Sequence, residues 1–371
     1  MKILFLGDYS GFHSTLAKQL RAEGRDCTVV SGGSGYMNTA RDISLTRRPG
    51  KVSGAKYLLQ ALRLLPKLKG YDVVELINPG FFDLRPEKLK YFFDRLKKQN
   101  GIISLTLAGT DSNFVKAMTG ENEFRHTDYR VGEVPTEYAV KFSEETENWL
   151  QNPLADYCRY VYDSVDGAVS GLYEYHVAAE KYLNGKPLVY GGIPVDTEVL
   201  KFTEFSKKDD EKINLFVGIK REYAEFKGTD RLLSAAKEIE RRFPDRCEVT
   251  VVENVPLAEY LQKMDKADVI LDQIYSYTPA TNALQAMAKG KIAVSGGEPE
   301  FYDFIGEQEL MPIVNALPDD EELKGVLENL VTKNGEELRE MSVASRRFIE
   351  KHNSSAVVAK RFLSAWEKMA K

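Results

Sequence analysis

The stretch ADVILDQIYSYTPATNALQAMAKGKIAVSGG, residues 267–297, holds two apolar runs of strand length with a helical segment between them. The runs are ADVILDQ and KIAVSGG, and the helical segment is NALQAMAKG. A strand, a helix and a second strand in this order form the unit from which parallel sheets with helices on both faces are built. The stretch therefore predicts an α/β fold.

The same alternation of strands and helices occurs in two series along the 371 residues. The first series contains KILFLG, CTVVSG, DVVELIN, IISLTLAG, GAVSG and PLVYGG, and the second contains INLFVG, CEVTVVENV, ADVILDQ and KIAVSGG. The charged stretch LKFTEFSKKDDEKIN separates the two series. Because single cores stop growing at roughly 250 to 300 residues, we expect two Rossmann-like, doubly wound domains with parallel sheets.

We place the first domain at residues 1–198, a linker at 199–210, the second domain at 211–345 and a helical tail at 346–371. Ligands of open α/β sheets bind at the carboxyl ends of the strands. Two such domains facing one another are therefore expected to bind their ligands in the cleft between them.

Composition argues against several classes of protein. The net charge of -5 and the pI of about 5.7 give no overall attraction to nucleic acid. No apolar run approaches the roughly 18 to 20 residues that span a bilayer, and we expect the first ten residues to form a strand and not a signal peptide. Cys27, Cys158 and Cys247 are odd in number and far apart, which is typical of buried thiols in a cytoplasmic protein.

The sequence lacks the patterns of two common kinds of cofactor site. The four histidines, His13, His126, His176 and His352, are not paired at the spacing of a helical zinc site, so we expect no metal. The first strand continues into GDYSGFH, which lacks the G-x-G-x-x-G of dinucleotide-binding folds. We therefore expect neither NAD nor FAD, and no other cofactor.

A loop with two cations follows the first strand of the second series. In GIKREYAEFKGTDRLL, residues 218–233, Arg221 and Lys227 stand six residues apart, and Asp230 lies in the first turn of an amphipathic helix. Above the carboxyl edge of a parallel sheet, such cations are able to hold a diphosphate without metal, Arg through its planar fork and Lys as a point charge. The alternative is a solvated charged loop.

The stretch quoted first contains a second candidate anion site, at the start of its helix. Thr278 before Pro279 resembles an N-cap with proline at the first helical position. The backbone N–H groups of Ala280, Thr281 and Asn282 would then point at the cleft, where a phosphate gains roughly 0.3 to 2 kcal/mol from the helix dipole. The alternative is an ordinary capped helix, and the presence of both sites in one domain favours the functional interpretation.

These segments together resemble the GT-B glycosyltransferases, in particular the retaining family 4 type. The resemblance rests on GDYSG, LAGTD, VYDSVDGAVSG, GGIPVDTEVL, EFKGTD, ADVILDQ, ALQAMAKGKIAVSGG and EKHNSSAVVAKRFLSAW, which extend over nearly the whole chain. It implies a nucleotide-sugar donor held by the C-terminal domain and an acceptor held by the N-terminal domain. It also implies that the final helix, around Trp366, crosses back to the first domain.

The resemblance further implies which residues contact the donor. Arg221 and Lys227 would contact the diphosphate, and Asn254 and Val255, in the turn after Glu253, would lie near the base. The family therefore assigns the two cations of the loop the same role that their chemistry suggests.

Tyr277 and Gln285 stand where the family often has two glutamates separated by seven residues. Gln285 would replace the glutamate that binds the ribose, and with Tyr277, Thr281 and Asn282 it completes the expected donor contacts. Hydrogen bonds to charged groups contribute roughly 1.5 to 3 kcal/mol and neutral ones about 0.5 to 1.5 kcal/mol. A loss of about 1 kcal/mol weakens donor affinity less than about tenfold.

On the acceptor side, the resemblance concerns the loops after two strands of the first domain. Gly11 and His13 follow the first strand, and Asp111 of LAGTD would lie near the reacting sugar as a catalytic residue. Ala108 stands where many relatives carry a histidine. His13 and His126 are therefore expected as candidate substrate contacts from loops.

The resemblance implies transfer with retention, in which the departing diphosphate assists the incoming hydroxyl on the same face of the sugar. The protein then contributes positioning and charge stabilisation of the leaving group. We expect a hexosyl or related transferase in cell-envelope polysaccharide biosynthesis, with a glycan or lipid-linked acceptor. Two alternatives stay open: a noncatalytic relative that partners an active transferase, motivated by Ala108, Tyr277 and Gln285, and a sugar-nucleotide epimerase.

Residues 41–70 of the first domain are basic and amphipathic. They hold eight Lys or Arg and one acidic residue, Asp42. Leucines recur at helical spacing, at positions 58, 59, 62, 65 and 68. A helix of this composition can lie on an anionic membrane surface, and the alternative is a helix that covers the sheet with its charges in solvent. We therefore expect a cytoplasmic protein with a candidate peripheral membrane contact.

Overall fold

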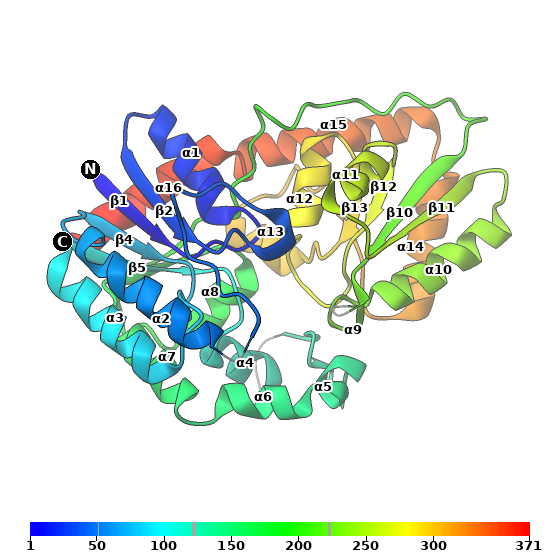
Figure 1. The fold of residues 1–371 in the computed structure, drawn as a ribbon. Coiled ribbons are helices and arrows are strands. Elements are labelled where there is room, and N and C mark those ends of the chain that lie inside the picture. The colour runs from blue at the N-terminus through cyan, green and yellow to red at the C-terminus, as the bar shows by residue number, and fades with distance from the viewer. Residues whose placement is uncertain (51, 121–123, 222–223) are drawn as a thin grey trace. The chain divides into compact units, whose positions relative to one another are not determined.

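The structure of the chain is a computed structural model, which describes residues 1–50, 52–120, 124–221 and 224–371. It divides the chain into two compact units (Figure 1). Unit 1 comprises Met1–Glu121, Ser143–Pro194 and Ser355–Lys371, and unit 2 comprises Asn122–Phe142 and Val195–Ser354. Neither unit is a continuous stretch of the sequence.

In the described part of the chain, unit 1 is built on a seven-stranded parallel sheet with the order β3-β2-β1-β4-β5-β8-β9. The strands are β1 (Lys2–Leu6), β2 (Asp26–Ser31), β3 (Ile43–Ser44), β4 (Val73–Leu76), β5 (Ile102–Leu107), β8 (Gly167–Ser170) and β9 (Leu188–Tyr190). The helices are α1 (Phe12–Ala22), α2 (Ser53–Leu64), α3 (Pro86–Gln99), α4 (Ser112–Thr119), α6 (Ser143–Leu150), α7 (Leu154–Ser164), α8 (Tyr173–Glu180) and α16 (Ser355–Met369), with the 3-10 turns η1 (Gly35–Met37) and η2 (Leu65–Lys67). The strand order reverses between β1 and β4, which is where such sheets bind their ligands.

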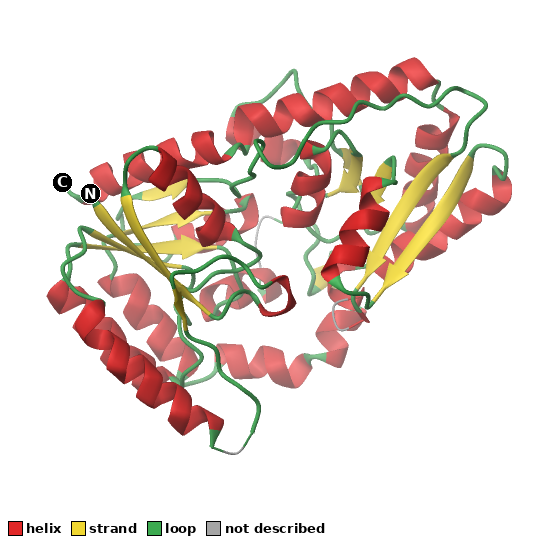
Figure 2. Cartoon of the chain, turned by 45° about the horizontal axis from the view of Figure 1, so that its top comes forward, coloured by secondary structure: helices red, strands yellow, loops and turns green. Residues whose placement is uncertain are grey.

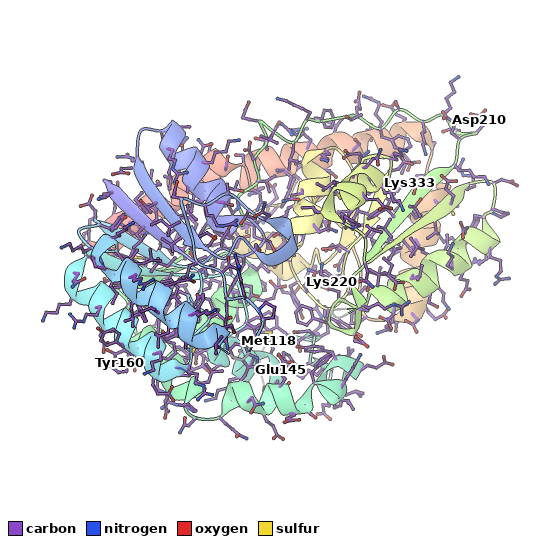
Figure 3. All side chains as sticks on the ribbon, viewed as in Figure 1. Met118, Glu145, Tyr160, Asp210, Lys220 and Lys333 are labelled. Carbon is purple, nitrogen blue, oxygen red and sulfur yellow. The ribbon has the colours of Figure 1, made fainter. Side chains whose placement is uncertain are left out.

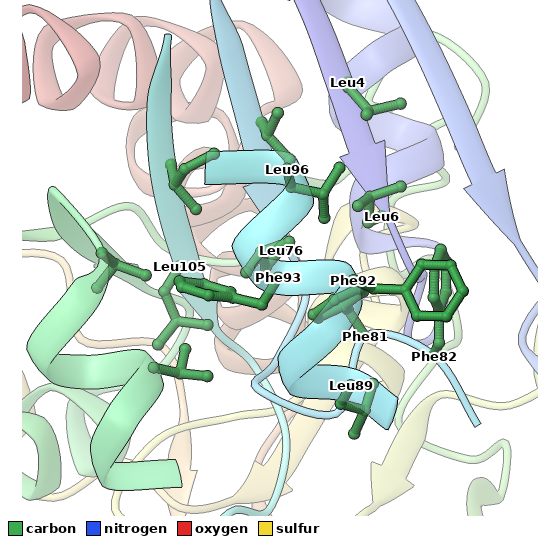
Figure 4. Packing of buried hydrophobic residues seen from close by; sticks show 14 of the residues in the cluster. Leu4, Leu6, Leu76, Phe81, Phe82, Leu89, Phe92, Phe93, Leu96 and Leu105 are labelled. Atoms are coloured by element: carbon green, nitrogen blue, oxygen red, sulfur yellow. The ribbon is translucent and has the colours of Figure 1, made fainter. Parts of the chain in front are cut away.

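One face of this sheet is covered by α2, α3 and α7. Their apolar side chains form one buried cluster with those of the strands, and Figure 4 shows Phe92 and Phe93 of α3 packed among Leu4, Leu6 and Leu76. Successive residues of a strand point to opposite faces of a sheet. Because Leu4 and Leu6 face this cluster, the residue between them faces the other side.

Helices α1 and α16 cover that second face. Phe5 packs against Trp366 of α16 with ring centroids 6.4 Å apart, and Phe12 of α1 packs against Phe362 at 5.9 Å. Trp366 is fully buried. The final helix of the chain therefore completes the core of unit 1.

Unit 2 contains, among the described residues, a five-stranded parallel sheet with the order β11-β10-β12-β13-β14. Figure 2 draws the strands of the chain in yellow and its helices in red. The strands are β10 (Ile213–Ile219), β11 (Cys247–Glu253), β12 (Val269–Leu271), β13 (Ile292–Ser295) and β14 (Val314–Asn315). The helices are α9 (Ala224–Lys227), α10 (Thr229–Arg242), α11 (Leu257–Asp265), α12 (Thr281–Ala288), α13 (Pro299–Ile305), α14 (Asp320–Thr332) and α15 (Gly335–His352). Here the strand order reverses at β10.

Unit 2 also includes a segment from the first half of the chain. The described part, Phe124–Phe142, contains the short antiparallel pair β6 (Arg130–Val131) and β7 (Val134–Pro135) and the helix α5 (Glu137–Lys141). Lys141 pairs with Glu225 of α9, 84 positions further along the chain. The expected first domain, residues 1–198, included this segment, because nothing in its local pattern indicates such distant contacts.

Two other boundaries also differ from the expected ones. The stretch expected as a linker, 199–210, belongs to unit 2, where Phe205 is buried in the core and its N–H donates to Ser342 Oγ at 3.1 Å. The tail expected from residue 346 divides at Ser355, so that the end of α15 lies in unit 2 and α16 in unit 1. The stretch resembles a linker because most of its residues are polar or charged, whereas the buried Phe205 anchors it to unit 2.

The structure also bears on two expectations from composition, which concern the cysteines and membrane-spanning helices. Cys27, Cys158 and Cys247 are buried and free, and burial raises the pKa of the Cys27 and Cys247 thiols to about 11. Thiols with such pKa values stay protonated at pH 7 and are poor nucleophiles. In the part of the chain that the structure describes, no helix has the length and apolar content that crossing a bilayer requires.

Candidate functional site

The loops that follow the central strands of unit 2 meet at one edge of its sheet. Because β10, β11, β12 and β13 are parallel, their carboxyl ends lie on the same side. The strand order reverses at β10, and open α/β sheets bind their ligands at such a point. Lys220, labelled in Figure 3, directly follows β10, and Asp272 directly follows β12. The side chains that follow these strands are therefore the first candidates for a binding site.

Lys227 and Asp272 form the centre of a polar network at this edge. The Nζ of Lys227 lies 2.9 Å from Oδ1 of Asp272, whose side chain is 1% exposed. The Asn282 amide donates to the same oxygen at 3.2 Å, and the Tyr260 hydroxyl donates to Asn282 Oδ1 at 2.8 Å. The Lys227 side chain is 30% exposed and its ammonium carries three N–H donors. It is therefore able to receive an anion while it remains on Asp272.

Arg221 stands at the neighbouring strand end and is also paired. Its guanidinium binds both carboxylate oxygens of Glu253 at the end of β11, with Nη2 3.0 Å from Oε2. The next residue, Asn254, is exposed with a φ of 49°, and its N–H donates to the Ile219 carbonyl at 3.3 Å. Val255 packs against an apolar cluster beneath α11. Both predicted cations thus lie at strand ends of one sheet, each held by a carboxylate.

Helix α12 begins at Thr281 with Ala280 as its N-cap, and not at Pro279 as the sequence indicated. Thr278, expected as the N-cap, is buried, and its carbonyl accepts hydrogen bonds from Gln273 at 3.2 Å and Ser276 at 3.0 Å. These bonds keep the chain in a loop before the helix. Because alanine has no polar side chain, the start of α12 has no side-chain cap. The helix start that the sequence analysis predicts as an anion site therefore lies two residues further along the chain than expected.

Gln285 lies one turn further along α12. It shares a helix face with Thr281 and Asn282, because side chains three and four positions apart are neighbours. It is half-buried, and its amide has no hydrogen-bond partner among the described residues. A free amide offers a carbonyl acceptor and N–H donors to a ligand. The position suits the predicted contact with a hydroxyl group.

Tyr277 is enclosed within unit 2. It is 1% exposed, and its hydroxyl accepts a hydrogen bond from the backbone N–H of Arg125 at 2.6 Å. Its ring stacks on His126 with centroids 4.8 Å apart and meets Phe124 edge-on at 4.9 Å. Tyr277 therefore anchors the Phe124–Phe142 segment to unit 2, and we remove it from the predicted donor contacts.

The same segment adds a cluster of charges that the sequence analysis missed. The Arg125 guanidinium pairs with Glu298 and Glu300 at the start of α13. Burial raises the pKa of the Glu298 carboxyl, and burial together with Arg125 lowers the pKa of His126 to about 4. His126 is therefore neutral at pH 7 and enclosed in unit 2, which corrects its prediction as a substrate contact. The carboxylates of GGEPE, directly after a strand, were the available signal for this cluster.

Unit 1 holds a cavity of about 670 Å³ at the carboxyl ends of β1 and β4, where its strand order reverses. The walls come from the loops after β1, β4 and β5 and from α2 and α7. Residues that line it include Tyr9, Arg47, Tyr57, Asn78, Phe81, Asp111, Trp149 and Tyr157. Small-molecule sites typically enclose roughly 300 to 1,000 Å³ and combine aromatic walls with a few polar groups. The cavity meets both criteria.

Polar groups of this cavity also hold its walls in place. Asp111, predicted to be catalytic, caps α4: Oδ1 accepts from the Phe114 N–H and Oδ2 from the Tyr162 hydroxyl, both at 2.8 Å. Burial raises the pKa of this carboxyl. The Asn78 amide donates to two carbonyls of the neighbouring loop at 3.1 and 3.2 Å. Asp111 therefore lies at the cavity with both oxygens engaged by the protein.

His13 does not reach the surface of unit 1, contrary to its prediction as an acceptor contact. Its ring nitrogens lie 2.8 Å from the Gly7 carbonyl and 3.1 Å from the Thr106 hydroxyl, and the residue is fully buried. Burial lowers the pKa of His13 to about 3. Gly11 is the N-cap of α1 with a φ of 83°, a conformation that favours glycine. Ala108 directly follows β5 and is half-buried.

Glu75, in the middle of β4, completes the buried network that contains His13. The Thr106 hydroxyl donates to Glu75 Oε1 and the Trp366 indole N–H donates to Oε2, both at 2.7 Å. Burial raises the pKa of Glu75 to about 7. A carboxyl inside a sheet that titrates near neutrality makes the stability of unit 1 sensitive to pH.

The residues that the structure describes include no group of three or more His, Cys, Asp or Glu side chains arranged to hold a metal ion. At the sheet edge of unit 2, Lys227, Arg221 and the start of α12 are the groups suited to meet an anion. They come from two loops that follow strands of one sheet.

Comparison with known proteins places this architecture. No family model and no curated protein matches the chain. Sucrose-phosphate synthase from Thermosynechococcus elongatus is similar in structure, with a TM-score of 0.64, 14% identity, and coverage of 100% of this chain and 99% of that chain. The Anabaena protein HepE in complex with UDP-glucose has a TM-score of 0.58 and 12% identity, over 99% of both chains.

A Listeria monocytogenes protein, provisionally named as a UDP-N-acetylglucosamine 2-epimerase, has a TM-score of 0.53 and 12% identity, over 98% of this chain and 94% of that chain. At such identities the likeness concerns the fold. The fold predicted from the sequence is confirmed: the chain has the GT-B fold, with two Rossmann-like α/β units that each contain a parallel sheet.

Proposed function

We propose that the protein is a glycosyltransferase that moves a sugar from a nucleotide-sugar donor to a hydroxyl acceptor. The observation that carries this proposal is the sheet edge of unit 2, where Lys227, Arg221 and the uncapped start of α12 follow strands at the point of reversal. The HepE structure, similar over the whole chain, contains UDP-glucose, which is a nucleotide sugar. The resemblance in sequence to retaining GT-B enzymes supports the same activity.

In this proposal, unit 2 binds the nucleotide. Lys227 holds the diphosphate with the N–H donors that Asp272 leaves open, and Arg221, 74% exposed, exchanges the carboxylate of Glu253 for a phosphate. Gln285 accepts a hydrogen bond from a ribose hydroxyl. Asn254, at the exposed turn after β11, lies beside the base.

The transfer step follows from the charges. When the bond between sugar and phosphate breaks, negative charge grows on the diphosphate, where Lys227, Arg221 and the N–H groups of α12 stabilise it. The departing phosphate accepts the proton of the incoming hydroxyl on the same face of the sugar, so the product retains the donor's configuration. No metal or cofactor takes part. The cavity of unit 1 receives the acceptor, a glycan or lipid-linked hydroxyl compound of cell-envelope polysaccharide synthesis.

A donor screen with purified protein tests this function. We expect release of free nucleoside diphosphate from one nucleotide sugar, and an anomeric configuration of the product, measured by NMR, that matches the donor. Arg221→Ala combined with Lys227→Ala should lower nucleotide affinity and transfer at least a hundredfold, because two charge-assisted contacts at roughly 1.5 to 3 kcal/mol each are lost. Lys201→Ala combined with Arg241→Ala is the matched control. Unchanged affinity in the first variant would contradict the donor site.

Two alternatives give different results in the same screen. A noncatalytic relative is favoured by Ala108, Tyr277 and Gln285, which stand where the family often has a histidine and two glutamates, and by the burial of Tyr277. It would bind a nucleotide and release no diphosphate from any donor. An epimerase, suggested by the similarity to the Listeria protein, would interconvert two nucleotide sugars without an acceptor.

A further inference from the structure

The outer side of α2 and η2 combines exposed apolar and basic side chains. Val52, Leu59 and Leu62 are 62%, 49% and 37% exposed. One exposed cation, Lys56, lies between them in the sequence and three more follow Leu62, and no acidic residue occurs between Asp42 and Asp72. We name the following seven residues the basic-apolar face: Val52, Lys56, Leu59, Leu62, Arg63, Lys67 and Lys69.

Packing of unit 1 does not account for this face. The inner side of the same segment already covers the sheet, with Tyr57, Ala61 and Leu68 in the core cluster. Helical periodicity separates these residues from Val52, Leu59 and Leu62, which lie on the opposite side. The segment therefore covers the sheet with its inner side and presents exposed apolar and basic side chains on its outer side.

Positive charge is concentrated in residues 41–99, which include α2, η2 and α3. The whole chain has a net charge of -5, but residues 41–99 contain fourteen Lys or Arg against six Asp or Glu. Within the described residues, Lys56, Arg63, Lys67 and Lys69 form no ion pair. One of the six acids, Asp94 of α3, is bonded to Lys90 and to the hydroxyl of Tyr160, which Figure 3 labels at the outer surface. The excess positive charge on α2 and η2 is therefore unneutralised.

We propose that the basic-apolar face docks unit 1 on an anionic lipid surface. Each Lys or Arg near such a surface strengthens binding about fivefold, and exposed leucine and valine side chains gain by entering the boundary between headgroups and acyl chains. A soluble polyanion, such as nucleic acid or an acidic glycan, would use the cations and leave the apolar side chains in water. The pairing of both kinds of side chain on one helix side favours the lipid.

Docking has a consequence for the cavity of unit 1. Leu45, Thr46, Arg47 and Tyr57 line this cavity and belong to residues 41–70, the segment that carries the basic-apolar face. A lipid-bound unit 1 would hold the cavity close to the headgroups, so the acceptor would be lipid-linked. This last step rests on the proposed function, whereas the docking itself does not.

The test uses the full chain with phosphatidylcholine vesicles that contain or lack phosphatidylglycerol. We expect cosedimentation with the anionic vesicles at low salt, weaker binding at high salt, and none with the neutral vesicles. Lys56→Glu, Arg63→Glu and Lys67→Glu together should lower partitioning at least a hundredfold, and Leu59→Ser with Leu62→Ser at least about tenfold. The matched control reverses three exposed cations of unit 2: Lys201→Glu, Arg241→Glu and Lys266→Glu should bind like the wild type.

Several outcomes would overturn the docking proposal. The first is the absence of binding to anionic vesicles at low salt. The second is binding that the leucine substitutions do not weaken and that heparin shows equally, which would identify a site for soluble polyanions. Concentration-dependent self-association that Leu59→Ser with Leu62→Ser abolishes would identify a second copy of the chain as the occupant. Melting curves and UDP affinity, measured on every variant, separate loss of docking from misfolding and from failure of the donor site.

Discussion

A buried carboxylate at a strand end requires a cation, and in unit 2 this requirement determines where Lys227 lies. Asp272 is almost completely enclosed and is bonded to Lys227 and Asn282. The pair therefore has two functions that mutation can separate: it stabilises the sheet edge, and it aims the remaining donors of the ammonium at the proposed diphosphate.

Lys227→Gln should destabilise unit 2 by about 1 to 3 kcal/mol, because it leaves the buried carboxylate of Asp272 without its countercharge. Adding Asp272→Asn should restore most of the stability and should not restore nucleotide affinity. Chemical denaturation and calorimetry with UDP measure the two effects. Recovery of nucleotide binding in the double variant would contradict the role of Lys227 as a phosphate ligand.

Gln285→Glu should tighten nucleotide binding by up to about tenfold, because a hydrogen bond from a ribose hydroxyl to a carboxylate is stronger than one to an amide. The free amide of Gln285 means that the change breaks no existing contact. Gln262→Glu on α11 serves as the charge-matched control. A weaker affinity in the Gln285 variant would place the ribose elsewhere.

Glu75→Gln isolates the titration of one buried carboxyl. The folded-state pKa of about 7 lies above the ordinary 4.5, so the folded chain binds more protons than the unfolded chain between these values. Wild-type stability therefore loses a contribution of about 3 kcal/mol as pH rises from 4.5 to above 7. The free energy of unfolding of the variant, relative to the wild type, should increase over this range. A pH-independent difference in denaturation curves would contradict the assignment.

For single residues, the sequence indicated which strand a side chain follows and did not indicate which distant residue it contacts. The sequence placed Arg221 and Lys227 after a strand because a cationic loop in that position is a local pattern. Tyr277 was misplaced because its partner, Arg125, lies 152 positions away, and no local pattern encodes that contact. His13 was misplaced because its enclosure depends on Thr106, in a different strand.

Among the elements, the Phe124–Phe142 segment is the one whose place depends on contacts with distant residues. Its anchors are Tyr277, the pair of Arg125 with Glu298, and the pair of Lys141 with Glu225. Glu225 lies two residues before Lys227, and Tyr277 lies four residues before the start of α12 at Thr281. We therefore expect the segment to hold in place the loops that form the proposed donor site.

Tyr277→Phe removes the acceptor for the Arg125 N–H and should cost about 1 to 3 kcal/mol. The loss should appear as faster hydrogen exchange across Phe124–Phe142, with the strands of the sheet unchanged. Tyr91→Phe, at an exposed tyrosine of α3, is the control. Unchanged exchange in the segment would mean that the ion pairs hold it without the hydroxyl.

Strands could be predicted from the sequence where their apolar runs were long. Each apolar run named above became a strand, from β1 to β13, because both faces of a parallel sheet are buried. The two-residue strands β3, β6, β7 and β14 have no such pattern and were not expected. The start of α12 was misplaced because hydrogen bonds to Thr278 from Gln273 and Ser276 extend the preceding loop.

For the whole molecule, buried histidines should determine acid stability. Burial lowers the pKa of His13 to about 3 and those of His126 and His176 to about 4. Below pH 6.5 the unfolded chain takes up protons at these positions and the folded chain does not, so stability falls as pH decreases towards 4. The carboxyls of Glu75, Asp111 and Glu298, whose pKa values burial raises, oppose this trend, and we expect the three histidines to outweigh them. We expect a net loss of at least roughly 3 kcal/mol between pH 6.5 and 4, measured by denaturant titration.

The path of the chain between the two units also matters for protein engineering. The simplest way to exchange the proposed donor unit for that of another protein would be to join two gene fragments at a single junction. In this protein, a junction near residue 195 would take Tyr277 and its neighbours from one parent, whereas Phe124–Phe142, which packs against Tyr277, would come from the other parent. A functional chimera therefore needs residues 122–142 from the same parent as the rest of unit 2, and α16 from the same parent as the rest of unit 1.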